Sequence, residues 1–107
     1  MSTRHGVVFA PEAEAQIVAI YDRIAVAASP AIARRFTEAI VARCESLDRM
    51  PRRGKPRDDL RPGLRTLSLR RRVMIAYAVE GKLVTILGVF YGGQDWEAML
   101  AEEWSGE

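Results

Sequence analysis

The spacing of apolar residues along this chain changes once, and that change constrains the fold more than any other feature. Up to about residue 49 the apolar residues recur every three or four positions, which is the period of one face of an α-helix. From residue 65 onward they alternate with polar residues or run continuously, as they do in β-strands. Helices followed by strands within 107 residues predict an α+β fold in which the helices cover one sheet.

The first half of the chain predicts a short strand and two amphipathic helices. Residues 7–10 are apolar and a proline follows them, so we expect a brief N-terminal strand and then a helix ending near Ala28. Ser29 and Pro30 supply an N-cap and a first-turn proline for a second helix, which extends to about Arg49. The apolar stripes comprise Ala13, Ile17, Ile20, Tyr21 and Ile24 in the first helix and Ile32, Phe36, Ile40, Cys44 and Leu47 in the second, whereas polar residues such as Gln16 lie elsewhere on the wheel. The short link predicts an antiparallel helical hairpin.

The second half predicts a loop followed by a small, mainly antiparallel sheet. Residues 51–63 contain three prolines and two glycines and must therefore form a loop. Residues 65–69 alternate in polarity, as expected of a half-buried strand. Residues 73–79 and 83–90 are nearly continuous apolar runs joined by a tight turn at residues 80–82, which is typical of a hairpin of interior strands.

No internal repeat or domain boundary is evident after a polar start. We expect residues 1–6 to be flexible and residues 7–107 to form a single domain that ends in a short C-terminal helix or tail around Trp96. No apolar run approaches the roughly 18 residues of a membrane-spanning helix, and the start lacks the pattern of a signal peptide. These features predict a cytoplasmic protein without a membrane partner.

The formal net charge of +2 conceals two regions of opposite charge. Between Arg49 and Arg72 ten cations face only Asp58 and Asp59, which gives this segment a charge of +8 and leaves −6 for the other 83 residues. Arginine supplies 14 of the 16 cations, and its planar guanidinium suits paired hydrogen bonds with carboxylate or phosphate. The segment is therefore either a surface for an acidic partner or a solvated basic loop.

Composition excludes several classes of site. One cysteine and one histidine leave no disulfide and too few ligands for a structural zinc, so we expect neither a metal nor a cofactor. Cys44 falls on the apolar stripe of the second helix, which indicates core packing rather than nucleophilic chemistry. No glycine-rich phosphate loop and no Ser/His/Asp set is present.

One constellation compatible with RNA cleavage remains. Arg65 and Arg72 flank the first long strand and could bind a phosphate, and Tyr91 at the end of the last strand could lie near them if the strands are neighbours. Such a set could stabilise the transition state while a 2′-hydroxyl attacks, without a metal. In the alternative, the arginines meet partner carboxylates or water, and Tyr77 fills the core.

Five strings, in this order, carry a family resemblance over nearly the whole chain. They are APEAEAQIVAIYDRIA in the first helix, SPAIARRFTEAIVARCESLDRMPRRG through the second, RDDLRPGLRTLSL into the sheet, VMIAYAVEGKLVTILGVF in the hairpin, and YGGQDWE after it. In these respects the chain resembles the ParE branch of the RelE/ParE toxin superfamily of type II toxin–antitoxin modules, also described as plasmid stabilisation proteins.

The resemblance implies a helical hairpin on a small sheet and a ParD-like antitoxin whose acidic C-terminal region wraps the toxin in a hetero-oligomer. It also implies one of two targets: ParE-like toxins act on DNA gyrase, and RelE-like toxins cleave messenger RNA on the ribosome. This chain departs from the RelE-like pattern because Gly88, Tyr91 and Gln94 stand where that pattern has Arg, His and Arg. Fewer cations at the would-be active site disfavour cleavage.

The leading hypothesis is therefore a growth-inhibiting toxin that inhibits gyrase without being an enzyme and is neutralised by its antitoxin. The alternative is a metal-independent, ribosome-dependent endoribonuclease that uses Arg65, Arg72 and Tyr91, and a third reading is a partner-binding module whose toxicity has decayed. The residues expected to contact the antitoxin are Arg52, Arg53, Arg57, Arg61, Arg65, Arg70, Arg71 and Arg72.

Overall fold

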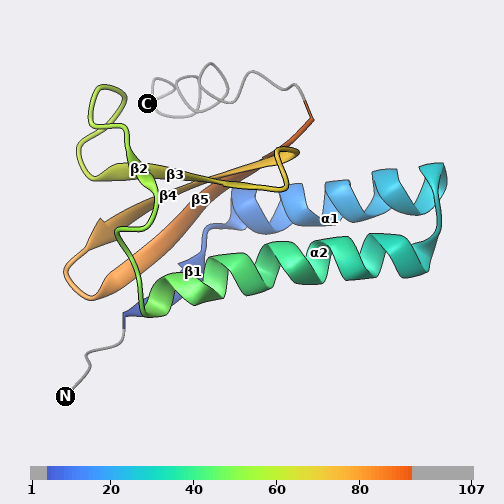
Figure 1. The fold of residues 1–107 in the computed structure, drawn as a ribbon, viewed down its shortest axis with the longest axis horizontal. Coiled ribbons are helices and arrows are strands. Elements are labelled where there is room, and N and C mark those ends of the chain that lie inside the picture. The colour runs from blue at the N-terminus through green and yellow to red at the C-terminus, as the bar shows by residue number, and fades with distance from the viewer. Residues whose placement is uncertain (1–4, 93–107) are drawn as a thin grey trace.

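Two helices pack as an antiparallel hairpin against one face of a five-stranded sheet (Figure 1). The computed structural model describes residues 5–92. Helix α1 spans Pro11–Ala27 and helix α2 spans Pro30–Glu45, after which a 3-10 turn, η1, covers Ser46–Asp48. The expected α+β hairpin-on-sheet architecture is confirmed, and the expected C-terminal helix or tail lies outside the described residues.

The helix boundaries follow from local chemistry. The Ser29 hydroxyl accepts a hydrogen bond from the Ile32 N–H at 3.1 Å, and Pro30 occupies the first turn, so the predicted cap is present. The α-helical part of the second helix ends earlier than the predicted Arg49, because its last turn tightens to the 3-10 form of η1.

The sheet has the order β1-β5-β4-β3-β2. Its strands are β1 (Gly6–Phe9), β2 (Lys55–Pro56), β3 (Leu64–Leu69), β4 (Val73–Glu80) and β5 (Leu83–Tyr91). Strand β1 runs parallel to β5 and the other pairs are antiparallel, as a mainly antiparallel sheet requires. Gly6 already belongs to β1, one residue inside the start that we expected to be flexible. The loop prediction for residues 51–63 missed β2, because a two-residue strand containing proline leaves no periodic signal and fits only a sheet edge.

The hairpin of β4 and β5 forms as the sequence predicts. Glu80 pairs with Leu83, so Gly81 and Lys82 form a two-residue turn, and Gly81 adopts the positive φ of 59° that such turns favour. The pairing of β4 with β5 has a register shift between Ala76 and Tyr77, and such a shift disrupts the hydrogen bonds between the strands locally. Helix α1 supplies a partner nearby, because the Gln16 side-chain oxygen accepts a hydrogen bond from the Val89 N–H at 2.7 Å. Gln16 therefore faces the sheet rather than the polar side of its helix.

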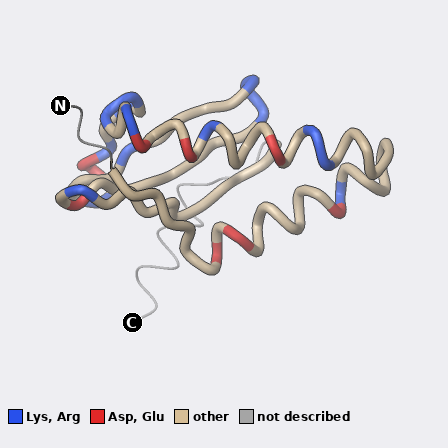
Figure 2. The backbone as a smooth tube through the Cα atoms, turned by 90° about the horizontal axis from the view of Figure 1, so that it is seen from below, with Lys and Arg blue, Asp and Glu red and all other residues tan. Residues whose placement is uncertain are grey.

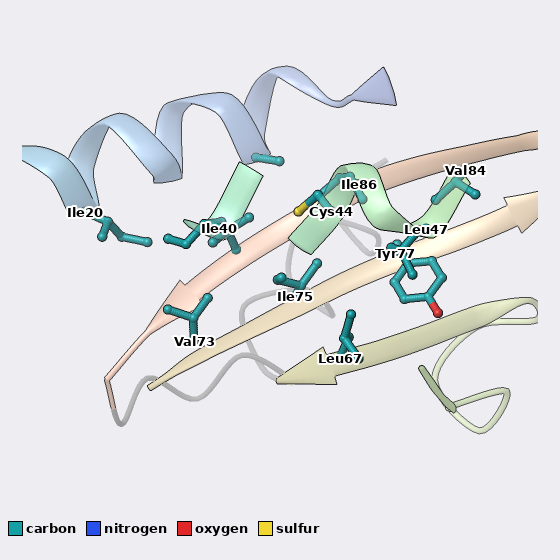
Figure 3. Close-up of a cluster of buried hydrophobic side chains, with 12 residues drawn as sticks. Ile20, Ile40, Cys44, Leu47, Leu67, Val73, Ile75, Tyr77, Val84 and Ile86 are labelled. Carbon is teal, nitrogen blue, oxygen red and sulfur yellow. The ribbon is translucent and has the colours of Figure 1, made fainter. Parts of the chain in front are cut away.

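The principal core lies between the hairpin and the sheet (Figure 3). Ile40, Cys44 and Leu47 pack from the helix layer onto strand residues that include Ile75 and Ile86. Cys44 is fully buried, and burial, helped by Glu45, raises the pKa of its thiol to about 12. A thiol that stays protonated at neutral pH is a poor nucleophile, which confirms the packing role expected for Cys44.

A second apolar cluster lies on the sheet face opposite the helices. Leu64, Ala76 and Phe90 form its buried centre, with Leu60, Met74 and Leu87 packed around them. Thr66 shares this face through its pairing with Ala76 and is buried too, so the expectation that β3 keeps one solvated face is wrong for this position. No helix between residues 5 and 92 is long and apolar enough to cross a membrane.

Candidate partner-binding surface

The cationic segment divides into two groups at opposite ends of the sheet (Figure 2). Arg52, Arg53, Arg57, Arg61 and Arg65 lie in or beside the loop before β3, and we call them the loop cluster. Arg70, Arg71 and Arg72 form the turn between β3 and β4, and we call them the turn cluster. Arg70 follows Arg65 by five positions along β3 and its end, which is roughly 17 Å at the rise of an extended chain. The segment between Arg49 and Arg72, with its charge of +8, therefore forms two surfaces rather than one.

Two side chains from the sheet hold the loop cluster in place. The Tyr77 hydroxyl donates a hydrogen bond to the Pro51 carbonyl and accepts one from the Gly54 N–H, both at 2.8 Å. The Arg65 guanidinium donates to the carbonyls of Gly54 at 2.7 Å and Arg52 at 3.1 Å. Gly54 admits no side chain, because an added Cβ would lie 2.6 Å from the Tyr77 oxygen and 2.7 Å from the Thr66 carbonyl oxygen. The loop backbone is therefore anchored to β3 and β4.

Anchoring changes what the loop cluster can do. Arg52 and Arg53 are exposed on a backbone whose position is already set, so a partner would order less of the loop on binding. The Arg57 guanidinium pairs with Asp59 through two hydrogen bonds of 3.0 and 2.9 Å and lowers the pKa of that carboxyl. The half-buried Arg65 is committed to loop carbonyls. The loop cluster is therefore a fixed surface, not a freely solvated loop.

The same contacts explain the state of Tyr77. Burial raises the pKa of its hydroxyl, an effect that the Gly54 N–H and the charges of Arg65 and Arg53 partly offset. The ring belongs to the principal core, as the alternative reading of the sequence proposed for Tyr77. The protonated hydroxyl has a structural role, because it donates a hydrogen bond to the loop backbone.

The turn cluster is built on an unfavourable backbone. Arg70 and Arg71 adopt φ of 52° and 59°, and the Arg72 N–H closes the turn on the Leu69 carbonyl at 3.0 Å. Glycine and asparagine are the usual residues here, since a left-handed conformation costs another residue about 1 kcal/mol. All three arginines are exposed. Arginine at two such positions points to a role for the side chains rather than for the turn itself.

An apolar groove of about 360 Å³ lies beside the turn cluster. Its apolar lining comes from the tip of the helical hairpin, and its rim carries two guanidinium groups; the lining residues are Arg23, Ile24, Ala27, Ala28, Ile32, Phe36, Arg72 and Tyr91. The Tyr91 ring meets Phe36 edge to face, with centroids 5.7 Å apart, and Arg23 lies 5.5 Å from its centroid. We call this the Arg23–Arg72 groove.

Sequence reasoning missed this groove. It assigned Ile24 and Ile32 to stripes that face the sheet, but Ile32 is 45% exposed because the hairpin tip extends past the strands. The available signal was the cluster of apolar residues around the helix–helix link, where no strand could cover them. An apolar surface bordered by like charges is typical of a binding site for an amphipathic segment of opposite charge.

The proposed RNA-cleaving set is only partly assembled. Arg72 and Tyr91 line one groove, and Gly92 after Tyr91 donates a backbone hydrogen bond to the Arg72 carbonyl at 2.8 Å. Arg65 lies beside Tyr77 at the other end of β3, turned to the loop. One phosphate would have to reach both ends of a strand to contact all three. Among residues 5–92, no group of three or more His, Cys, Asp or Glu residues is placed to hold a metal ion.

Comparison with known proteins gives the family. Residues 7–96 match the family described as the ParE toxin of the type II toxin–antitoxin system parDE. A structure of the chromosomal ParDE system from P. aeruginosa superposes with a TM-score of 0.73 and 29% identity, over 85% of this chain and 99% of that one. The toxin–antitoxin complex RelBE2 from Mycobacterium tuberculosis has the same fold, with a TM-score of 0.61 and 21% identity over 88% and 98% of the two chains. No curated protein sequence matches the chain. The family match covers most of the residues, and this chain therefore belongs to the ParE family, as the toxin of a type II toxin–antitoxin module.

Proposed function

We propose that this toxin inhibits DNA gyrase through its surface and that its antitoxin neutralises it by covering the arginine clusters. The observation that supports gyrase inhibition over RNA cleavage is the separation of Arg65 from Arg72 and Tyr91. Arg65 makes two hydrogen bonds to the loop, so the chemistry needed for RNA cleavage would lack one of its cations. A gyrase inhibitor needs a binding surface and no such set. The setting proposed for this activity is the cytoplasm.

A supercoiling assay tests the gyrase target. Purified toxin added to gyrase, relaxed plasmid and ATP should reduce supercoiling, and addition of equimolar antitoxin should restore it. Expression of the toxin alone should induce the DNA-damage response. Unchanged supercoiling together with an absent damage response would overturn the proposal.

Mapping of transcript ends during expression tests the alternative, a ribosome-dependent endoribonuclease. Cleavage within translated messages that Arg72→Ala abolishes would establish that activity instead.

The Arg23–Arg72 groove supports the proposal that an antitoxin neutralises the toxin by covering its arginine clusters. An acidic amphipathic segment could place apolar side chains against Ile24, Ile32 and Phe36 while its carboxylates meet Arg23 and Arg72. Exposed ion pairs contribute only about 0–1 kcal/mol each, so the apolar contacts must supply most of the affinity. The charges would instead speed association and select the partner.

A pair of charge insertions on the hairpin tests this surface. Ile32→Glu places a carboxylate in the groove and should weaken binding of the antitoxin encoded beside the toxin by at least about tenfold, because an apolar contact is lost and like charges meet. Val26→Glu is the matched control: Val26 is 89% exposed and lies outside the groove lining. Equal affinities for the two variants would remove the groove from the proposed interface.

A further inference from the structure

The turn cluster concentrates positive charge that the fold itself does not use. At the other end of the sheet, Arg65 is committed to the carbonyls of the loop. Between residues 5 and 92, no carboxylate forms an ion pair with a guanidinium group of the turn cluster, and all three groups are exposed. Their turn projects at the edge of the molecule (Figure 2). Three adjacent charges are therefore available to a ligand from outside the chain.

The backbone holds these charges at fixed positions. The Arg72 N–H donates to the Leu69 carbonyl at 3.0 Å, and the Arg72 carbonyl accepts a hydrogen bond from the Gly92 N–H at 2.8 Å. The turn is thus tied both to the end of β3 and to the end of β5. A backbone that is fixed before binding loses less conformational entropy when a ligand arrives.

A hollow of about 330 Å³ lies beside the turn. Its lining residues are Ser68, Arg71, Arg72, Val73, Met74 and Gly92. The exposed Ser68 supplies a hydroxyl donor, and the two arginines supply planar groups of several donors each. Arginine and serine side chains are typical contacts of phosphate oxygens in complexes with DNA. The hollow therefore offers both charge and hydrogen-bond donors to a phosphate group.

The same hollow is poorly suited to an acidic peptide. Its apolar lining residues offer little surface, because Val73 is 2% exposed and Met74 is half-buried in the second apolar cluster. Exposed pairs of arginine and carboxylate add little affinity by themselves, so a peptide needs an apolar anchor. The Arg23–Arg72 groove provides such an anchor. A phosphodiester backbone needs none, because the release of its condensed counterions drives binding.

We propose that the turn cluster and Ser68 bind the phosphate backbone of duplex DNA without reading its sequence. Contacts to phosphates position a protein on DNA but carry no sequence information. The choice of duplex DNA rests on the proposed function, because duplex DNA is the substrate that gyrase holds. Arg72 lines both the hollow and the Arg23–Arg72 groove, so an antitoxin in the groove would compete with DNA.

Fluorescence anisotropy of a short labelled duplex with the full-length toxin measures this binding without gyrase. Three phosphate contacts predict that the logarithm of the association constant falls with the logarithm of salt concentration with a slope of about −2.7. Arg71→Gln should reduce the slope by about 0.9 and weaken binding about tenfold at low salt. Arg34→Gln is the matched control, because it removes the same charge from an exposed position of α2 and should change affinity by less than about twofold.

A second variant separates loss of charge from a weakened turn. Arg71→Gly suits the positive φ of this position, so a loss of binding equal to that of Arg71→Gln would come from the charge. Equal losses for Arg71→Gln and Arg34→Gln would overturn the proposal, because general attraction to a basic protein would explain them.

Two other ligands test the choice of duplex DNA. Tighter binding of single-stranded RNA of the same sequence would overturn the proposal, and so would binding of polyglutamate that depends on Arg71 without binding of DNA. DNA binding that depends on Arg71, combined with unchanged supercoiling by gyrase, would support this inference and overturn only the gyrase target.

Discussion

The two ends of the sheet carry the same residue type and use it differently. At the loop end, the Arg65 guanidinium and the Tyr77 hydroxyl together make four hydrogen bonds to the backbone of residues 51–54. At the turn end, Arg70 and Arg71 sit on a strained backbone, and Arg72 borders an apolar groove. Arginine is thus a structural residue at one end and an exposed residue at the rim of a groove at the other.

The difference lies in what surrounds each guanidinium. Loop carbonyls converge on Arg65, and a charged donor satisfies them better than a neutral one. Around Arg72, by contrast, most of the groove lining is apolar, and the arginine side chain is exposed. Substitutions at the loop end should therefore affect stability first, and substitutions at the turn end should affect binding first.

The largest expected effect is that of Gly54→Ala at the loop end. The new methyl group would overlap the Tyr77 hydroxyl and the Thr66 carbonyl, and backbone cannot give way as a flexible side chain can. We expect a loss of about 3 kcal/mol in the free energy of unfolding, measured by urea denaturation. Gly6→Ala is the control, since the nearest atom to its added Cβ is 3.7 Å away. Similar losses for both would mean that the loop end is not rigid.

The next effect is that of Tyr77→Phe, which removes the hydroxyl and leaves the buried Gly54 N–H without its acceptor. The expected loss in the free energy of unfolding is about 2 kcal/mol.

The contribution of the Tyr77 hydroxyl to stability should also depend on pH, with a defined sign. Because burial raises the pKa of Tyr77, the folded hydroxyl keeps its proton above pH 10.0, where the unfolded one ionises. This contribution to stability is complete below pH 10.0 and is lost above it, so Tyr77→Phe should show a shallower decline at high pH. An unchanged decline would contradict this.

A smaller effect of opposite sign is expected at the turn. The double substitution Arg70→Asn with Arg71→Gly gives each position a residue that tolerates positive φ and should raise the free energy of unfolding by about 1 kcal/mol. The same variant should bind antitoxin more weakly, because two exposed charges are gone. Calorimetric titration measures the affinity. A variant that is more stable and binds equally well would remove the turn cluster from the interface.

The smallest effect on stability is expected for charge reversal on the loop surface. Arg52→Glu and Arg53→Glu leave the backbone anchors intact, so stability should change by less than about 0.5 kcal/mol. Association with the antitoxin should nevertheless slow by about tenfold at low salt and lose part of its salt dependence, because both residues are exposed cations of the loop cluster. Stopped-flow measurements at two ionic strengths check this, and an unchanged rate would argue against electrostatic steering by the loop cluster.

Much of the fold could be predicted because its signals are local. The helix start at Ser29, the turn at Gly81 and the apolar stripe through Ile40 and Cys44 each depend on residues a few positions apart. Strand β2 and the pairing of β1 with β5 could not be predicted, because both depend on contacts between distant residues and leave no period of their own. Thr66 was misjudged for the same reason, since its burial is decided by what packs on the second face.

The candidate site, like the fold, could be predicted from the sequence only in part. The arginine content between residues 49 and 72 is visible in the sequence, and so is the family resemblance that the match over residues 7–96 confirms. The choice between a structural and an exposed arginine is not visible, because Arg65 and Arg72 differ only in what the fold brings to them. The Arg23–Arg72 groove is equally hidden, since its lining comes from the helical hairpin, the turn between β3 and β4, and the end of β5.

The sequence by itself determined the two helices, the longer strands, the uneven distribution of charge and the family, because helical period, turn residues and composition act over short distances. Only the tertiary structure decided that the arginines form two surfaces, that Tyr77 and Arg65 anchor a loop, and that Arg72 and Tyr91 share a groove with Arg23. The physical reason is that hydrogen bonding and burial depend on neighbours in space, and the strand pairing that sets those neighbours joins residues far apart in the chain.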